Sequence, residues 1–279
     1  MEKEKTQGST LAKLPYILLE LINNESPESV DYIIARYILD HLTELSGASI
    51  QDISDACEVS KSTLSRFCRK AGLEDFQEMK NELQQANFIP EYKFNVPLVG
   101  SDGKGYLKKV SEQVMKLDEA LDYSQIEKLV KEIYNSKNVL LFGSMQAMNP
   151  AVNLQQDILF LDKVVRVPGM YALQLSAIEK ARSNDLLICF SNSGNFFERL
   201  FENQGDKHIL NNLKIWMITG NENAKKLPYL NEVIWIPDNH NYASHPLQFD
   251  LTARVIAMAY SEYVRKEKKI RNRSGFLFL

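Results

Sequence analysis

The chain has 279 residues, a formal net charge of −3 and 44% hydrophobic residues. It therefore has room for about two domains with buried cores, and its overall charge favours no class of partner. Its three cysteines form no CxxC pair and no His/Cys cluster, and no apolar run reaches the roughly 18–20 residues that cross a bilayer. No signal peptide is recognisable, so we expect a cytoplasmic protein without metal, cofactor or membrane contact.

Two helices are predicted in the first sixty residues. Over residues 28–47, one face carries Val30, Ile33, Ile34, Tyr37, Ile38, Leu42 and Leu45. Residues 49–59 predict a shorter helix, because Ser49 is a good N-cap and Asp52 completes a capping-box pattern. Its expected apolar face consists of Ile50, Ile53, Ala56 and Cys57.

A third helix is predicted between Ser60, as N-cap, and Gly72, just past the C-terminus. Its apolar stripe consists of Leu64, Phe67, Cys68 and Ala71. Its polar side chains are Lys61, Ser62, Thr63, Ser65, Arg66, Arg69 and Lys70. Taken alone, this pattern also fits an ordinary solvated amphipathic helix. Only about three residues separate it from the preceding helix, however, and that spacing is typical of a helix-turn-helix that reads DNA.

The charge of the region fits DNA binding through the third helix. Residues 1–90 carry 9 Lys+Arg against 15 Asp+Glu, a net of −6, yet residues 59–72 contain four basic residues and no acid. We expect Ser62, Ser65 and Arg66 to face bases. Arg69 and Lys70 are expected to favour phosphates. The surrounding acids would repel DNA elsewhere and favour one docking orientation.

The pattern changes after residue 88. Residues 88–105 contain prolines and glycines without a helical period, which predicts a linker between a helical domain at 1–87 and a second domain at 106–279. In the second domain, predicted helices alternate with apolar strands at 138–143, 163–168, 185–190, 213–219 and 232–237. This alternation predicts a three-layer, doubly wound α/β domain around a parallel sheet.

Ligands of such sheets bind at the carboxyl ends of the strands. The stretches at 142–150 and at 190–198 both lie there. The second loop offers hydroxyls, a glycine and a following helix N-terminus, which suits an anion, although an ordinary capped loop fits equally well. The expected effector-binding residues are Ser144, Ser191, Asn192, Ser193, Gly194 and Asn195.

Residues 49–83 resemble the helix-turn-helix of the RpiR family of bacterial transcriptional regulators, most specifically in "STLSRFCRKAG" and "FQEMK". Residues from about 106 to 270 resemble the SIS (sugar isomerase) domain of the same family. The chain departs from the family at the turn, where Glu58 replaces a common glycine. In the sugar-phosphate loops, Met145, Ala147 and Phe196 replace a glycine and two hydroxyl residues.

The resemblance implies a regulator of carbohydrate-metabolism genes whose SIS domain senses a phosphosugar-like metabolite. An alternative is a sugar-phosphate isomerase that uses Glu198, His208, His240 or His245, and another is a regulator whose SIS domain only dimerises. The lost hydroxyls weaken both sensing and catalysis. We expect a homodimer or homotetramer on an inverted-repeat operator. The basic C-terminal residues 264–279 are expected to extend the last helix, with the final "FLFL" either docked on a partner or free.

Overall fold

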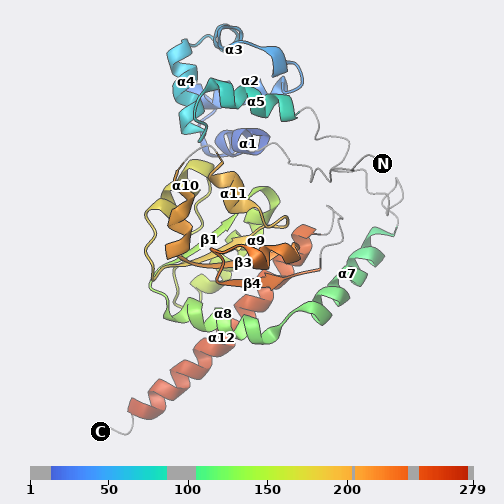
Figure 1. Ribbon diagram of the computed structural model, residues 1–279, viewed down its shortest axis with the longest axis vertical. Helices are drawn as coiled ribbons and strands as arrows, with labels where there is room; N and C mark the ends of the chain where they lie inside the picture. The colour runs from blue at the N-terminus through green and yellow to red at the C-terminus, as the bar shows by residue number, and fades with distance from the viewer. Residues whose placement is uncertain (1–13, 87–104, 203–204, 238–244, 276–279) are drawn as a thin grey trace. The chain divides into compact units, whose positions relative to one another are not determined.

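The computed structural model describes residues 14–86, 105–202, 205–237 and 245–275 (Figure 1). The chain divides into two compact units, one up to residue 95 and one from residue 96 onward, with residues 170–172 grouped with the first. The expected linker at 88–105, His240 and the final "FLFL" lie outside the described residues, apart from Gly105. The two proposed boundaries, between residues 87 and 88 and between residues 105 and 106, therefore stay predictions.

The N-terminal unit is helical in its described part. Its elements are α1 (Leu14–Asn24), α2 (Val30–Asp40), the 3₁₀ helix η1 (Leu45–Gly47), α3 (Ile50–Ala56), α4 (Lys61–Lys70) and α5 (Phe76–Ala86). They share one core of buried side chains, to which α1 contributes four residues and α4 three. The core therefore draws on more helices than the three expected from the sequence.

Three details of the predicted N-terminal helices are wrong. The helix expected over 28–47 ends at Asp40, and Val30 and Ile33 are each 44% exposed, whereas Ala35 is fully buried. The buried face of α2 is therefore rotated towards Ile34, Ala35 and Ile38, because α1 and α4 both pack against it. On α3, Ala56 is exposed and Ser54 is buried instead.

The C-terminal unit alternates helices and strands, as expected. Its elements are α7 (Tyr106–Ala120), α8 (Tyr123–Asn135), β1 (Val139–Gly143), η2 (Met145–Ala147), α9 (Met148–Leu159), α10 (Tyr171–Glu179), β2 (Leu186–Phe190), α11 (Phe196–Leu200), η3 (Lys207–Asn212), β3 (Lys214–Thr219), η4 (Glu222–Lys226), β4 (Glu232–Trp235) and α12 (His245–Gly275). No helix in the described part is both long and apolar enough to cross a membrane.

The sheet is parallel throughout, in the order β1-β2-β3-β4. The strand expected at 163–168 is reduced to a single bridge between Leu140 and Arg166 at the free edge of β1. Arg166 donates to the Val139 carbonyl and accepts from Leu141. The next donor of a parallel ladder would be residue 168, and Pro168 has no N–H, so the pairing stops there.

Helices cover both faces of the sheet (Figure 1). Alternate strand residues, among them Leu141, Ile188 and Trp216, share one core with α8, α9 and α12. On the opposite face, Phe142 lies 6.0 Å from Phe196 of α11, centroid to centroid. The expected combination of an all-α helix-turn-helix region and a three-layer α/β domain is confirmed. After β1, the chain first runs to Arg166 on one side of that strand and later forms β2 on the other side. The topological switch point of the sheet, where the connections reverse direction, therefore lies between β1 and β2.

Candidate nucleic-acid interface and effector crevice

Helix α4 separates its apolar and polar side chains as the sequence predicts. Leu64, Phe67, Cys68 and Ala71 are buried in the N-terminal core. Lys61, Ser62, Arg66, Arg69 and Lys70 are exposed, whereas Thr63 and Ser65 are half-buried. The ends are fixed locally, since Ser60 Oγ accepts from the Thr63 N–H at 3.1 Å and Gly72 takes a φ of 81°.

A hydroxyl network organises the first turn of α4. Ser60 Oγ lies 2.7 Å from Ser62 Oγ and 2.9 Å from Thr63 Oγ1. Thr63 Oγ1 in turn accepts a long hydrogen bond of 3.5 Å from Arg66 Nη2. The guanidinium of Arg66 therefore lies beside the helix start, with its other N–H groups available to a base edge or a phosphate.

The turn between α3 and α4 contains a strained residue. Glu58 has a φ of 55°, in the left-handed region that favours glycine. The backbone is nevertheless held by the Val59 N–H, which donates to the Ser54 carbonyl at 2.9 Å. The departure from the family's glycine therefore costs conformational energy without changing the turn.

Replacing Glu58 by glycine is expected to raise the free energy of unfolding of the N-terminal unit by about 1 kcal/mol, because the side chain is what disfavours a positive φ. Urea unfolding followed by far-UV circular dichroism measures the change. Glu44→Gly, at an exposed position with a φ of −89°, is the matched control and should destabilise. Equal effects of the two substitutions would show that Glu58 is not strained.

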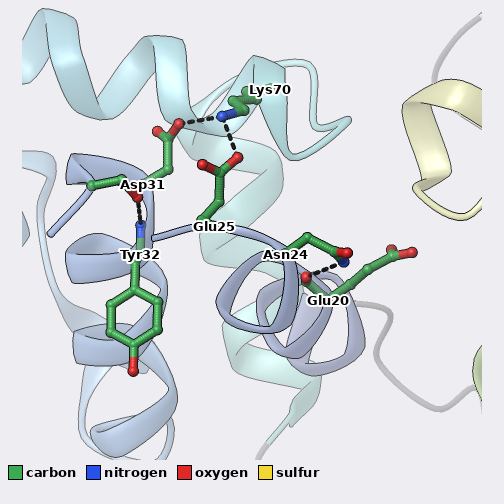
Figure 2. Close-up of polar contacts among 7 residues, drawn as sticks. Glu20, Asn24, Glu25, Asp31, Tyr32 and Lys70 are labelled. Carbon is green, nitrogen blue, oxygen red and sulfur yellow. Dashed lines mark hydrogen bonds and ion pairs between the residues drawn. The ribbon is translucent and has the colours of Figure 1, made fainter. Parts of the chain in front are cut away.

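Lys70 has surroundings that the sequence did not indicate (Figure 2). Its Nζ lies 2.6 Å from Glu25 Oε1 and 2.5 Å from Asp31 Oδ2. Hydrogen bonds to these carboxylates, first Asp31 and then Glu25, raise the pKa of Lys70. Because the pKa of Lys70 is raised, its contribution to stability is fully present below 10.5 and is lost as the pH rises above that value.

A cavity of about 650 Å³ lies beside α4. Its walls come from the start of α2, the α3–α4 turn and the inner edge of α4. The lining residues are Val30, Asp31, Glu58, Val59, Ser60, Thr63, Arg66, Phe67 and Lys70. The cavity therefore has two acidic and two basic side chains in its walls, immediately next to the proposed DNA-reading side chains.

In the C-terminal unit, the loop after β1 folds back tightly on itself. A Cβ on Gly143 would lie 2.2 Å from the Ala147 carbonyl oxygen, and Met145 takes a φ of 56°. The buried amide of Gln174 donates to the Gly143 carbonyl at 2.9 Å. The chain therefore packs so closely around Gly143 that no side chain fits there. Ser144 is exposed.

The loop after β2 uses its polar groups to hold its own shape. Ser191 is buried and its N–H donates to the Ile218 carbonyl, while Ser193 Oγ donates to the side-chain oxygen of Asn195. The Asn192 carbonyl accepts from Thr219 Oγ1 at 3.1 Å. Gly194 has a φ of 75°, so its position requires glycine. The expected helix after this loop is only five residues long, and Asn195 does not cap it with its side chain.

Two orphaned acceptors lie in these loops. Within the described part of the chain, Asn192 Oδ1 and Gln146 Oε1 are buried and have no hydrogen-bond partner. An orphaned buried acceptor is costly and calls for a donor. Gln146 follows β1 and Asn192 follows β2, on either side of the switch point. Sequence reasoning did not select Gln146, because a glutamine in a helical turn carries no distinguishing signal.

The acid and base side chains that an isomerase would need are held in other contacts or lie at other positions. Glu198 Oε1 accepts from Tyr229 Oη at 2.5 Å and pairs with Lys207 at 3.0 Å. Burial, followed by the hydrogen bond to Glu198, raises the pKa of Tyr229. His208 is exposed, and His245 begins α12. Phe196 is buried against Phe142 and Phe197 rather than at the loop surface.

A second cavity, of about 420 Å³, lies between α9, the segment at 166–169 and α10. It is lined by Gln155, Arg166, Val167, Pro168, Gly169, Leu173, Ser176, Ala177 and Lys180. No sequence pattern indicates this cavity, since its walls come from three segments that only the fold brings together. Cys57, Cys68 and Cys189 are all free and buried.

Comparison with known proteins supports the assignment of the N-terminal unit. Residues 18–87 match the family model described as "Helix-turn-helix domain, rpiR family". These residues form an rpiR-family helix-turn-helix domain. The matched range extends from within α1 beyond α5 and so contains the whole α3–α4 motif.

Two curated relatives are transcriptional regulators of the helix-turn-helix type. The HTH-type transcriptional regulator HexR of Pseudomonas aeruginosa is 25% identical over 184 residues, covering 63% of this chain and 65% of HexR. An uncharacterised regulator, TTE0211 of Caldanaerobacter subterraneus, is 34% identical over 64 residues, covering 23% of this chain and 22% of that protein. The chain thus matches less than two thirds of the length of these relatives.

One solved structure is similar over nearly the whole chain. It is the NanR protein of Vibrio vulnificus complexed with ManNAc-6P, with a TM-score of 0.50, 13% identity, and coverage of 95% of this chain and 97% of that chain. At this identity the similarity supports the fold alone, and it agrees with the helical region followed by the α/β unit.

Proposed function

We propose that this protein is a transcriptional regulator that reads DNA through α4. The observation that carries the proposal is the division of α4 into a buried apolar face and an exposed face with two arginines, inside an rpiR-family domain. In the described part of the chain, no carboxylate pairs with Arg66 or Arg69. Both guanidinium groups are therefore available for bidentate contacts with guanine or phosphate.

We further propose that the protein binds as a dimer through its C-terminal unit, on an operator with two-fold symmetry. One recognition helix reads only a few base pairs, and a dimer makes the second contact intramolecular. Selection of duplexes from a random pool by the full chain should therefore yield an inverted repeat, and light scattering should give at least twice the 32.0 kDa chain mass. A monomeric mass together with normal binding to a single half-site would contradict the dimer.

The C-terminal unit is proposed to sense a metabolite at the switch point between β1 and β2. The residues proposed to line this site are Ser144, Ser191, Asn192, Ser193, Gly194 and Asn195, and control of carbohydrate-metabolism genes is the role it would serve. The orphaned oxygens of Asn192 and Gln146 accept hydrogen bonds, so they suit a ligand hydroxyl rather than a phosphate oxygen. We therefore favour a sugar-like ligand with little charge, or a weakly held phosphosugar.

Ligand binding at this crevice is expected to be weak for simple phosphosugars. Each lost hydroxyl–phosphate bond is worth about 1.5–3 kcal/mol, so replacing two of them lowers affinity by roughly 10²-fold or more. Calorimetry against hexose and pentose phosphates, and against the matching free sugars, measures this difference. Micromolar binding of a phosphosugar that persists in the Ser191→Ala/Ser193→Ala protein would show that the site lies elsewhere.

No observation favours isomerase activity over regulation. Glu198 Oε1 is engaged by Tyr229 and Lys207, which favours a fixed carboxylate rather than a mobile general base. In the described part of the chain, Glu198 Oε2 is buried without a hydrogen-bond partner. A third alternative is a regulator that uses its C-terminal unit only for dimerisation. Such a protein would give no calorimetric response to any sugar, and adding sugar would not change its DNA binding.

A further inference from the structure

Among the basic residues of α4, Lys70 differs in that it pairs with two carboxylates of the same unit. It is the last residue of α4, Glu25 follows the end of α1, and Asp31 lies in the first turn of α2. Both contacts are short, at 2.6 Å and 2.5 Å. The ammonium group of Lys70 therefore connects the end of α4 with the start of α2 and with the residue that follows α1. The contact with Glu25 spans 45 residues of sequence (Figure 2).

The burial of this triad sets it apart from a simple surface pair. The side chains of Glu25 and Asp31 are 27% and 25% exposed, against 45% for Lys70. By contrast, the Arg36–Asp40 pair on α2 is 56% and 49% exposed and involves one carboxylate. A partly buried charge costs more when it loses its partner, so the two carboxylates depend on Lys70 more than an exposed pair would.

The triad also lies next to the proposed DNA-reading surface. Asp31 and Lys70 line the same cavity as Thr63 and Arg66. With Lys70 in place, the triad carries a net charge of −1; without it, two carboxylates would face the region where a phosphate backbone approaches Arg66. Like charges brought together in this way repel strongly.

Resting on the proposed DNA-binding function, we infer that Lys70 is a positioning residue that neutralises Glu25 and Asp31 beside the DNA-reading helix, rather than a residue that contacts phosphate. Lys61, Arg66 and Arg69 then supply the basic contacts of α4. The sequence alone favoured a phosphate contact for Lys70, because it cannot show which acids lie within reach of the last turn.

The test compares DNA affinity and its salt dependence in four full-chain proteins: wild type, Lys70→Met, Glu25→Gln/Asp31→Asn, and the triple variant. We expect Lys70→Met to weaken binding on the order of tenfold. The Glu25→Gln/Asp31→Asn protein should bind at least as tightly as wild type. The triple variant should return to within about threefold of wild type, with an unchanged slope of log K against log salt, because the number of phosphate contacts stays the same.

A matched control separates the local effect from overall charge. Lys70→Met/Glu44→Gln/Asp55→Asn has the same net charge as the triple variant but removes two exposed acids that do not contact Lys70. It should bind as weakly as Lys70→Met alone. Circular dichroism at the assay temperature shows whether each variant is folded. A variant that is less stable but still fully folded would keep its Kd, so a change in Kd reports on binding rather than on stability.

Three results would overturn the inference. The first is a triple variant that stays as weak as Lys70→Met, with a slope reduced by about 0.9, as loss of a phosphate contact predicts. The second is wild-type affinity in Lys70→Met. The third is equal recovery in the matched control. Failure of the wild-type protein to select any DNA would instead overturn the proposed function, so the two failures are distinguishable.

Discussion

Replacing Arg66 by alanine is expected to weaken operator binding by about 1–3 kcal/mol, or roughly 5- to 150-fold in Kd, and to relax the sequence preference. Arg66 lies on the exposed face of α4, within reach of Thr63 Oγ1. Its guanidinium fork matches the paired acceptors of a guanine edge, so its loss removes both affinity and discrimination. Fluorescence anisotropy on the selected duplex and on single-base variants measures both effects.

Arg36→Ala is the matched control, since it removes the same charge from an exposed position on α2, where Arg36 pairs with Asp40 at 2.7 Å. It should leave base preference unchanged. Because Arg69 is expected to contact phosphate, the Arg66→Ala/Arg69→Ala protein should also show a shallower salt dependence. Wild-type affinity in that double variant would refute the assignment of α4 as the reading helix.

Replacing Gly143 by alanine is expected to give the largest loss of stability among small substitutions in the C-terminal unit, at the upper end of about 1–3 kcal/mol. The added Cβ would meet the Ala147 carbonyl oxygen at 2.2 Å and the Met148 nitrogen at 2.9 Å. Both are backbone atoms, so no side-chain rotation relieves the clash. The turn after β1, on which the proposed crevice depends, would have to open.

Both tryptophans of the chain, Trp216 and Trp235, lie in β3 and β4, so urea unfolding followed by tryptophan fluorescence reports on the C-terminal unit. Ser144→Ala, at the exposed neighbouring position, should change the free energy of unfolding by no more than about 0.5 kcal/mol. If Gly143→Ala unfolds at the same urea concentration as wild type, the turn is not tightly packed at Gly143.

Features set by neighbours in sequence were predicted well. The caps at Ser49 and Ser60, the left-handed Gly72 and the buried stripe of α4 all follow from residues within one or two helical turns. The alternation of helices and apolar strands was enough to give the parallel sheet, because strands buried on both faces read as continuous apolar runs.

Features set by distant segments were not predictable in this way. The pairing of Lys70 with Glu25 and Asp31 depends on the packing of three helices, and the exposure of Val30 depends on which side of α2 its neighbours occupy. The expected strand at 163–168 has the right composition, yet only Arg166 bridges to β1, because Pro168 cannot continue the ladder. Likewise, the closure of the loop at Gly143 is invisible until Ala147 is seen folded against it.

A tethered cleavage reagent tests most directly whether α4 lies against DNA, on which the proposed function depends. The three native cysteines are buried, so Ser62→Cys provides a single exposed thiol on α4 for a DNA-cleaving iron chelate, and Leu19→Cys, at an exposed position on α1 of the same unit, provides the control. We predict that the chelate at position 62 cuts the selected duplex at two symmetric positions, whereas the chelate at position 19 leaves it intact. Cleavage from position 19 but not from position 62, with the duplex bound in both cases, would contradict the placement of α4 on DNA.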